Sequence, residues 1–306
     1  MHVAVTGASG LIGSALVRTL ISAGHQVSRL VRRRAGPGEI SWDPAAGRLD
    51  PNDLEGLDAV VHLAGENIGA RWTRSRKARI RNSRVQGTRL LSEALARARR
   101  PPQVLVSGSA LGFYGSRGDE ILTEKSGPGP ADDFLAIVGQ EWENAADAAR
   151  AAGIRVVHPR FGLVLSPDGG ALGKMLLPFR LGLGGRLGDG LQWMSWISID
   201  DAAGAVLHTL TNEGVSGPVN VTAPEPVRNR DFTRTLGRVL SRPTPFPVPA
   251  AALRLVLGEM ADYTLLASAR MLPERLLGSG YRFAHPDLEP ALRHVVGADP
   301  RAILPQ

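Results

Sequence analysis

The chain has 306 residues and no cysteine, so disulfide bridges, thiolate metal sites and a cysteine nucleophile are excluded. It also lacks an apolar run long enough to span a membrane, and we expect no leader segment ahead of the first apolar strand. These absences predict a cytoplasmic protein without a membrane partner. No two of the seven histidines have the spacing of a metal site, so the sequence predicts no bound metal.

Lysine is scarce: it occurs three times among 36 basic residues, so arginine (36 minus 3, or 33) carries most of the net charge of +7. The one dense basic group lies between Arg71 and Arg84 and contains a single aromatic residue, Trp72. It matches no nucleic-acid-binding motif, so we expect no nucleic-acid partner. We favour a solvated helix that turns one or two arginines toward an anionic ligand.

Glycine, in contrast, is abundant and regularly placed near the start of the chain. After an apolar run that begins at Val3, three glycines follow one another at intervals of three residues. The first permits a tight turn, the second lets backbone amides approach a pyrophosphate, and the third lets a helix pack closely on the strand. The N-terminus of that helix would hold the phosphates. The predicted cofactor residues of this turn are Gly7, Ser9, Gly10, Leu11, Ile12 and Gly13.

The surroundings of the glycine turn match its expected setting. Residues 11–23 keep one apolar face at helical spacing, Gly24 stands where a helix stops, and residues 26–31 have the composition of a second strand. A strand, turn, helix and strand of this length favour a dinucleotide site over the alternative, an ordinary glycine-rich turn.

Arginines follow the second predicted strand. Arg32, Arg33 and Arg34 stand where an NAD-specific site usually has a carboxylate for the ribose 2′-hydroxyl. A guanidinium can form paired, charge-assisted hydrogen bonds to a 2′-phosphate. Arg32 and Arg33 are therefore predicted to bind NADP(H). The alternative is a basic loop without function.

Strands and helices continue to alternate up to residue 159, which predicts an α/β fold with a Rossmann-type, doubly wound parallel sheet. Ligands of such sheets lie at the carboxyl ends of the strands. Ser109 and Tyr114 follow the strand that begins at Val104, so we expect them near the cofactor. His62 lies within an earlier strand and is expected to be a packed core residue.

The chain changes character in its second half, where glycines are predicted to form turns that line a substrate mouth and later helices are separated by prolines. We therefore expect a Rossmann domain and a smaller, mostly helical C-terminal substrate lobe. The predicted NADP-binding domain is 1–165, completed by 193–225, and the lobe is 166–192 with 226–306.

Several segments together resemble one protein family. They are Thr6–Gly13, Leu63–Asn67, Arg71–Trp72, Ser83–Arg84, Trp142–Glu143 and Met175–Gly190. Their order, over essentially the whole chain, is similar to that in the atypical, extended short-chain dehydrogenase/reductases called epimerase family proteins. These sugar-nucleotide-epimerase-like proteins end in a domain of unknown function.

The resemblance implies a Rossmann domain that binds NADP(H), with a small lobe over the nicotinamide. By motif position it implies that Arg32 meets the 2′-phosphate and that the turn Leu63–Gly65, with Leu63 and Ala64, lines the adenosine side. It also implies that Val164 lies near the nicotinamide. Arg84 stands where ordinary extended members have an asparagine, and it is expected to contact the cofactor.

One departure from the family pattern concerns catalysis. Ordinary members use a tyrosine and a lysine four residues later, but Leu135 and Gly139 occupy these positions here. Ser109 and Tyr114 supply the hydroxyl groups at the neighbouring strand end and are therefore the catalytic candidates. Without a cation nearby, the pKa of Tyr114 should stay near about 10. The alternative is that both residues only pack and hydrogen-bond the turn.

Two functions follow from these patterns. The first is an NADP(H)-dependent oxidoreductase or epimerase that acts on a small polar substrate, nucleotide-linked compounds included. The second is an NADP(H)-binding sensor or interaction protein without turnover. The dinucleotide turn joined to a separate lobe favours the first function, whereas the missing tyrosine–lysine pair favours the second.

Overall fold

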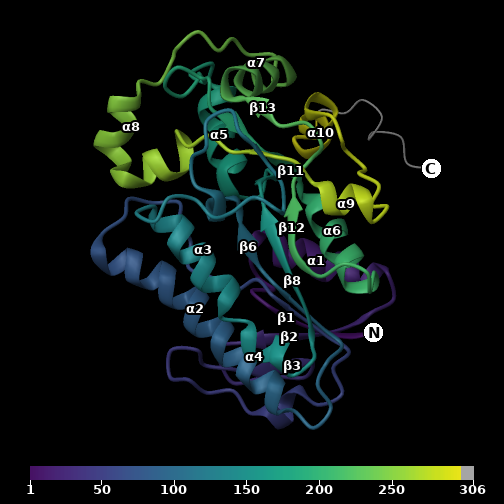
Figure 1. Cartoon of the computed structure of the whole chain (residues 1–306). Helices are drawn as coiled ribbons and strands as arrows, with labels where there is room; N and C mark the ends of the chain where they lie inside the picture. Colours follow the sequence, from purple (N-terminus) through teal and green to yellow (C-terminus); the bar gives the residue numbers. More distant parts are fainter. Residues whose placement is uncertain (298–306) are drawn as a thin grey trace, which may run out of the picture.

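The computed structural model describes residues 1–297 and shows a parallel β-sheet with helices on both faces (Figure 1). The strand order is β3-β2-β1-β4-β5-β8-β12, and β6 also pairs with β8. Residues 298–306, the end of the predicted C-terminal lobe, lie outside the described residues. The strand bounds are β1 (His2–Thr6), β2 (Gln26–Val31), β3 (Glu39–Ser41), β4 (Ala59–His62), β5 (Val104–Ser107), β6 (Ser109–Ala110), β8 (Arg155–Phe161) and β12 (Gly217–Val221).

Helices cover both faces of the sheet, which explains why the central strands are apolar throughout. Alternate side chains of a strand point to opposite faces of its sheet. In β1, Val3 and Val5 pack in a core formed with α1 and α6, whereas Ala4 belongs to a second core formed with α2 and α4. The predicted doubly wound parallel sheet is confirmed. The helices named here are α1 (Leu11–Ser22), α2 (Arg74–Arg97), α4 (Asp147–Ala151) and α6 (Ile199–Thr211).

Local signals place the first elements where the sequence predicts them. α1 ends at Ser22, Gly24 adopts the left-handed conformation with a φ of +78°, and β2 begins at Gln26. The long helix α2 starts after Thr73, whose side chain accepts a hydrogen bond from the backbone N–H of Arg76.

The glycine-rich stretch contains a helix, so the prediction that its glycines form turns is wrong for Gly169 and Gly170. Gly169 and Gly170 follow β9 (Leu163–Leu165) and open α5 (Gly170–Arg180). Gly170 has a φ of +66°, which permits the abrupt change of direction between the two elements. A Cβ atom on Gly170 would lie 3.1 Å from Cδ2 of Leu11, so the start of α5 lies against the glycine turn.

The remaining elements lie mostly beyond the carboxyl ends of the sheet strands, and Figure 1 shows α5, α7 and α8 together in its upper half. A separate apolar core forms there around Trp196 and Phe232, with residues of α5, α7 and α10. The division of the chain after residues 165, 192 and 225 stays a prediction. The bounds of the remaining elements are η1 (Pro51–Leu54), η2 (Leu111–Tyr114), β7 (Ile121–Leu122), α3 (Phe134–Asn144), β10 (Trp193–Met194), β11 (Trp196–Ser198), β13 (Val227–Arg228), α7 (Asn229–Val239), α8 (Ala250–Leu257), η3 (Ala261–Leu265), β14 (Arg270–Met271), α9 (Glu274–Gly278) and α10 (Leu288–Val295).

Within residues 1–297, no helix is both long and apolar enough to cross a bilayer.

Candidate cofactor site

The glycine turn lies where the strand order of the sheet reverses. After β1 the chain passes through α1 to β2 on one side, whereas β4 pairs with the other side of β1. Such a switch point leaves a crevice outside the carboxyl ends of the strands, where open α/β sheets bind ligands.

Gly7 and Gly13 bring backbone segments closer together than side chains would allow. Gly7 has a φ of +66°, and a Cβ atom on it would lie 2.8 Å from the carbonyl oxygen of Leu63 and from the nitrogen of Ala64. A Cβ atom on Gly13 would lie 2.1 Å from the Gly7 oxygen, so α1 packs directly on the turn. Gly10 differs, because its Cβ atom would meet only the Gly7 oxygen, at 3.2 Å. The turn and packing roles predicted for the first and third glycines are therefore present.

The start of α1 offers hydrogen-bond donors to an anion. Its N-cap residue, Gly10, supplies no side-chain cap, and the first turn carries no acidic residue. Within residues 1–297, the backbone N–H groups of Leu11 and Ile12 donate to no backbone carbonyl. Free N–H groups and the positive end of the helix dipole together favour anion binding. These donors fit the pyrophosphate of a dinucleotide.

Thr6 fixes the turn after β4, which borders the crevice on the side opposite α1. Its Oγ1 accepts hydrogen bonds from the N–H groups of Leu63 and Ala64, both at 3.1 Å, and lies 2.7 Å from Nδ1 of His62. The Thr6 hydroxyl and the His62 ring thus share one hydrogen bond, and Nε2 of His62 has no hydrogen-bond partner among the described residues. Burial, with a smaller effect of Arg84, lowers the pKa of His62 to about 4, so the ring is neutral at pH 7. His62 is thus a packed core residue, as predicted.

The two arginines predicted to meet a 2′-phosphate have different surroundings. Arg33 donates to both carboxylate oxygens of Glu39, at 2.7 and 2.6 Å, which occupies its guanidinium. Arg32 is exposed just beyond the end of β2, and its side chain forms no hydrogen bond or ion pair with any residue that the structure describes. Of the two, Arg32 is the one whose donors are available to a ligand.

Arg84 reaches the crevice from α2. Its Nη1 donates to the carbonyl oxygens of Glu66 and Ile80, at 3.0 and 3.2 Å, and its guanidinium carbon lies 5.0 Å from the ring centroid of Trp142. A Cβ atom on Gly65 would lie 3.3 Å from the Arg84 guanidinium, which therefore borders the turn after β4. Burial lowers the pKa of Arg84 to about 10, with Glu66 acting in the opposite direction, so the group is still a cation at pH 7.

Ser109 and Tyr114 belong to a buried polar network. The Ser109 hydroxyl donates to Glu143 at 2.7 Å, and Arg160 donates to both oxygens of Glu143, at 2.7 and 2.8 Å. Arg160 also donates to the Tyr114 hydroxyl at 2.9 Å, and Tyr114 donates to Oδ1 of Asn220 at 2.7 Å. Burial raises the pKa of Tyr114, although Arg160 acts to lower it.

This network corrects the interpretation of Tyr114. A cation does lie beside it, contrary to expectation, but burial has the larger effect on its pKa, and the side chain is fully buried. Tyr114 is therefore placed to hold the core together rather than to exchange a proton with a ligand. Ser109 is itself only 2% exposed, whereas 12% of the side chain of its partner Glu143 is exposed. Sequence reasoning missed Arg160, although a charge inside the apolar strand β8 is a usable signal.

Packing fills the positions of the missing tyrosine and lysine. A Cβ atom on Gly139 would lie 3.0 Å from Cα of Phe113, and one on Gly112 would lie 3.0 Å from Cβ of Leu135. η2 therefore packs tightly against α3, at the place where the family pattern puts its catalytic pair.

Val164 lies beside the glycine turn. It is part of β9, where it pairs with Ile197 of β11, and it packs against the core that contains α1. A Cβ atom on Gly170 would lie 3.8 Å from the Val164 carbonyl oxygen, so β9 and the start of α5 border the same crevice.

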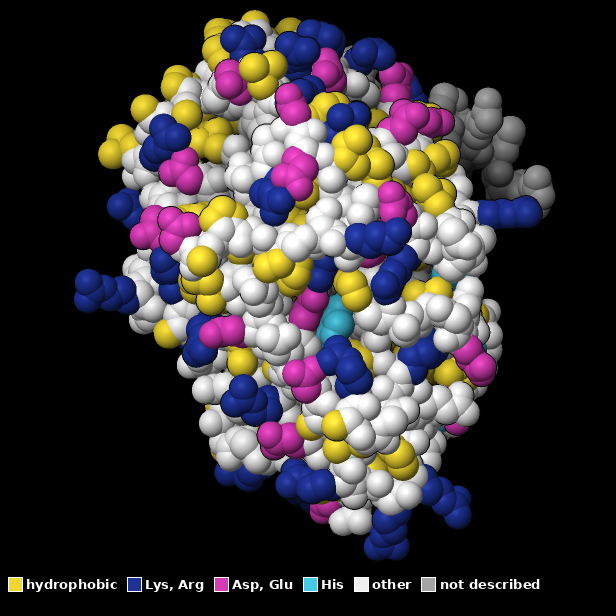
Figure 2. Space-filling model, viewed as in Figure 1, with side chains coloured by type: hydrophobic (Ala, Val, Ile, Leu, Met, Phe, Trp, Pro, Cys, Tyr) yellow, Lys and Arg dark blue, Asp and Glu magenta, His cyan; other side chains and the backbone are white. Residues whose placement is uncertain are grey.

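Several basic residues of the group between Arg71 and Arg84 have partners within the chain. Lys77 lies 2.7 Å from a Glu259 oxygen and Arg81 lies 2.6 Å from a Glu141 oxygen. Figure 2 shows lysine and arginine side chains scattered among acidic ones over the visible face. The group thus joins α2 to its neighbours, while Arg84 turns inward.

A parallel sheet of this order, with a glycine turn at its switch point, defines a protein of the Rossmann class. Residues 3–222 match the NAD dependent epimerase/dehydratase family, and residues 248–295 match the Domain of unknown function (DUF1731). The chain belongs to the NAD dependent epimerase/dehydratase family. The resemblance to epimerase family proteins with a C-terminal domain of unknown function is thereby confirmed.

Relatives of known sequence or structure match nearly all of the chain. Epimerase family protein Mb2239 of Mycobacterium bovis is 44% identical over 292 residues, which are 95% of this chain and 96% of the relative. A crystal structure of human epimerase family protein SDR39U1 with NADPH is 38% identical, with a TM-score of 0.88 over 97% of this chain and 99% of that one. The structure of a nucleoside-diphosphate sugar epimerase from Corynebacterium glutamicum is 39% identical, with a TM-score of 0.81 over 98% of this chain and 59% of that one.

Proposed function

We propose that this protein binds NADP(H) at the glycine turn and acts as an oxidoreductase or epimerase on a small polar substrate. The observation that carries the proposal is the first turn of α1, with free N–H groups on Leu11 and Ile12 above closely packed Gly7 and Gly13. The human relative crystallised with NADPH supports the phosphate-bearing form of the cofactor. Such a cofactor donates or accepts a hydride, and the protein's task is to bind and orient it.

Different elements around the crevice bind different parts of the cofactor. The glycine turn and α1 hold the pyrophosphate, the turn after β4 lines the adenosine side, and β9 and α2 approach the nicotinamide side. In this arrangement residues 1–165 and 193–225 form the cofactor domain, with the other segments over it. The proposed cofactor contacts are Gly7, Ser9, Gly10, Leu11, Ile12, Gly13, Arg32, Leu63, Ala64, Gly65, Arg84 and Val164.

The cofactor assignment is tested at Arg32. Calorimetry should show that NADPH binds more tightly than NADH, and Arg32→Asp should remove most of the difference. A charge-assisted hydrogen bond contributes about 1.5–3 kcal/mol, which corresponds to a ten- to hundred-fold preference. Arg282→Asp is the matched control, since it makes the same charge change at an exposed site in another loop. Equal affinities for NADPH and NADH in the unaltered protein would contradict the assignment.

Ser109 is the proposed substrate-orienting residue, with Glu143 as its hydrogen-bond partner. Once a substrate is found, Ser109→Ala should lower kcat/KM while NADPH still binds. Tyr114→Phe, by contrast, should lower stability with little effect on kcat/KM, because its hydroxyl is bound inside the network. A Ser109→Ala variant with unchanged kcat/KM would remove Ser109 from the active site.

A second function, an NADP(H)-binding sensor without turnover, is favoured by one observation. The close packing at Leu135 and Gly139, together with the burial of Tyr114, leaves no tyrosine–lysine pair at the usual place. A panel of nucleotide sugars and other small polar metabolites, followed by nicotinamide absorbance and product analysis, separates the two functions. Turnover of any member supports the enzyme, whereas tight NADPH binding without turnover across the panel supports the sensor.

A further inference from the structure

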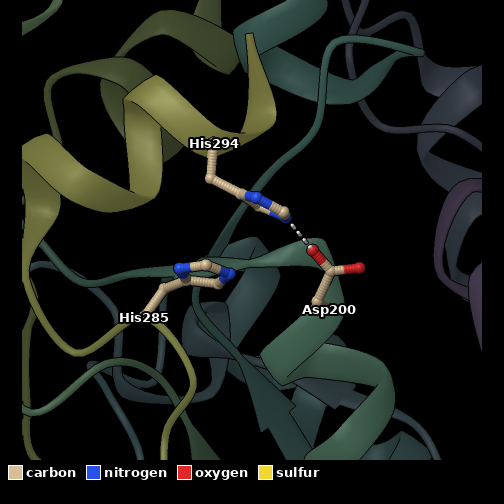
Figure 3. A group of neighbouring side chains, drawn as sticks. All are labelled: Asp200, His285 and His294. Atoms are coloured by element: carbon tan, nitrogen blue, oxygen red, sulfur yellow. Dashed lines mark hydrogen bonds and ion pairs between the residues drawn. The ribbon is translucent and has the colours of Figure 1, made fainter. Parts of the chain in front are cut away.

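Three metal-ligating side chains that are not among the proposed cofactor contacts meet in the structure. Asp200 comes from the first turn of α6, His285 from the loop after α9, and His294 from α10 (Figure 3). One ligand atom from each residue lies within 4.8 Å of the other two. The histidines are nine residues apart and the aspartate is distant in sequence, so residue spacing predicted no metal site here.

Hydrogen bonds and ring stacking hold this group in place. The carboxylate of Asp201 accepts hydrogen bonds from the N–H groups of Ala284 and His285, at 2.7 and 2.9 Å, which fastens the His285 loop to α6. Nε2 of His294 lies 2.7 Å from Asp200, and the rings of His285 and His294 stack with centroids 4.2 Å apart. The fold therefore gathers two imidazoles and one carboxylate at a single point.

The spacing suits a first-row divalent metal ion. Bonds from zinc to nitrogen or oxygen are about 2.0–2.2 Å long, so in tetrahedral geometry two ligand atoms on one ion lie about 3.3–3.6 Å apart. The three ligand atoms lie within 4.8 Å of one another, so their widest separation is at most about 1.5 Å too long for such an ion. Asp200 and His294 are exposed, so small side-chain rotations close that difference.

The surroundings leave room for the remaining ligands of such an ion. A cavity of about 250 Å³ is lined by Asp200 and His294, but not by His285, and its other lining residues include Arg18, Asp168 and Leu11 at the start of α1. Water molecules in this cavity can complete the coordination. Two imidazoles and one carboxylate with open positions are a donor set that binds Zn²⁺ and neighbouring first-row metals.

We propose that Asp200, His285 and His294 bind one divalent metal ion of the zinc type, with water in the remaining positions. The ion would join the two matched regions of the chain, because Asp200 lies within residues 3–222 and both histidines lie within residues 248–295. It would fasten α10 to α6. The proposal does not depend on cofactor binding or turnover.

The test uses the full chain without a histidine tag, freed of metal with a chelator. Calorimetry with Zn²⁺ should show one ion bound per chain, and Tm should rise by about 4 °C at a zinc concentration 100-fold above Kd. His285→Ala, His294→Ala and Asp200→Asn should each weaken binding at least tenfold. His25→Ala is the matched control and should bind as the unaltered protein does, because His25 lies beside Met1, away from the site.

The metal-free Tm of each variant shows whether the fold is intact. A variant that fails to fold is replaced by His285→Gln or His294→Gln, which keeps side-chain bulk and polarity without an imidazole. The proposal is overturned if the unaltered protein binds no Zn²⁺, or if the folded variants of the three residues bind it as tightly as the His25→Ala control.

Discussion

Restoring the tyrosine and lysine of ordinary family members should damage this protein rather than activate it. A Cβ atom at position 139 would lie 3.0 Å from Cα and 3.2 Å from Cβ of Phe113, closer than the optimal carbon separation of about 3.5–4.0 Å. η2 cannot easily retreat, because the adjacent Tyr114 hydroxyl donates to Asn220 and accepts from Arg160. The side chain at residue 139 would therefore have to displace an anchored segment.

The cost of Gly139→Lys has two parts. Overpacking of a well-filled interior costs about 1–3 kcal/mol, and burial of part of a lysine side chain with its polar group adds about 1–3 kcal/mol. Replacement of a glycine inside a helix returns up to about 1 kcal/mol. We therefore expect the free energy of unfolding to fall by about 2–4 kcal/mol.

Urea denaturation followed by circular dichroism measures this change. Ile137→Lys is the matched control on the same helix, because the Ile137 side chain is 36% exposed and its replacement should cost about 0.5 kcal/mol or less. The double variant Leu135→Tyr/Gly139→Lys should also show no gain in hydride transfer. A Gly139→Lys protein as stable as the unaltered one, or an active double variant, would refute the conclusion that packing excludes the pair.

Two further predictions concern the buried polar groups. Thr6→Val should lower the free energy of unfolding by about 2–4 kcal/mol, because it leaves the Ala64 N–H group and Nδ1 of His62 without their partner, whereas the Leu63 N–H group keeps the Thr6 carbonyl oxygen at 3.3 Å. Thr6→Ser should keep most of that stability in the same urea assay, and an unaffected valine variant would contradict the hydrogen-bond assignment. Stability should also fall in mild acid, since burial lowers the pKa of His62 and of His158 from 6.5 to about 4. The unfolded chain therefore binds more protons between these values, and each histidine should cost about 2 kcal/mol as the pH falls from about 7.5 to 5. Urea midpoints that do not change over this range would show that the rings are not held neutral by burial.

The cofactor half of the site could be predicted from the sequence because its determinants are local. Gly7 and Gly13 act within one turn and the helix that follows it, so their spacing already encodes the close packing that the structure shows. Arg32 follows directly on β2 and therefore stands at the end of its strand whatever the rest of the chain does. The alternation of apolar runs with amphipathic segments likewise determined the parallel sheet, because each pattern fits only one kind of element.

Only the tertiary structure decided the roles of Tyr114 and of the candidate metal ligands. Arg160 and Asn220 reach the Tyr114 hydroxyl from 46 and 106 residues away, and their contacts turn a catalytic candidate into a buried structural residue. Asp200 meets His294 across 94 residues to form the candidate metal site. Spacing along the chain carries no information about these long-range contacts, because the packing of whole helices and strands brings the residues together. The sequence by itself therefore determined the class of fold and the place of the dinucleotide turn, and long-range packing determined which polar groups are buried and which remain available to a ligand.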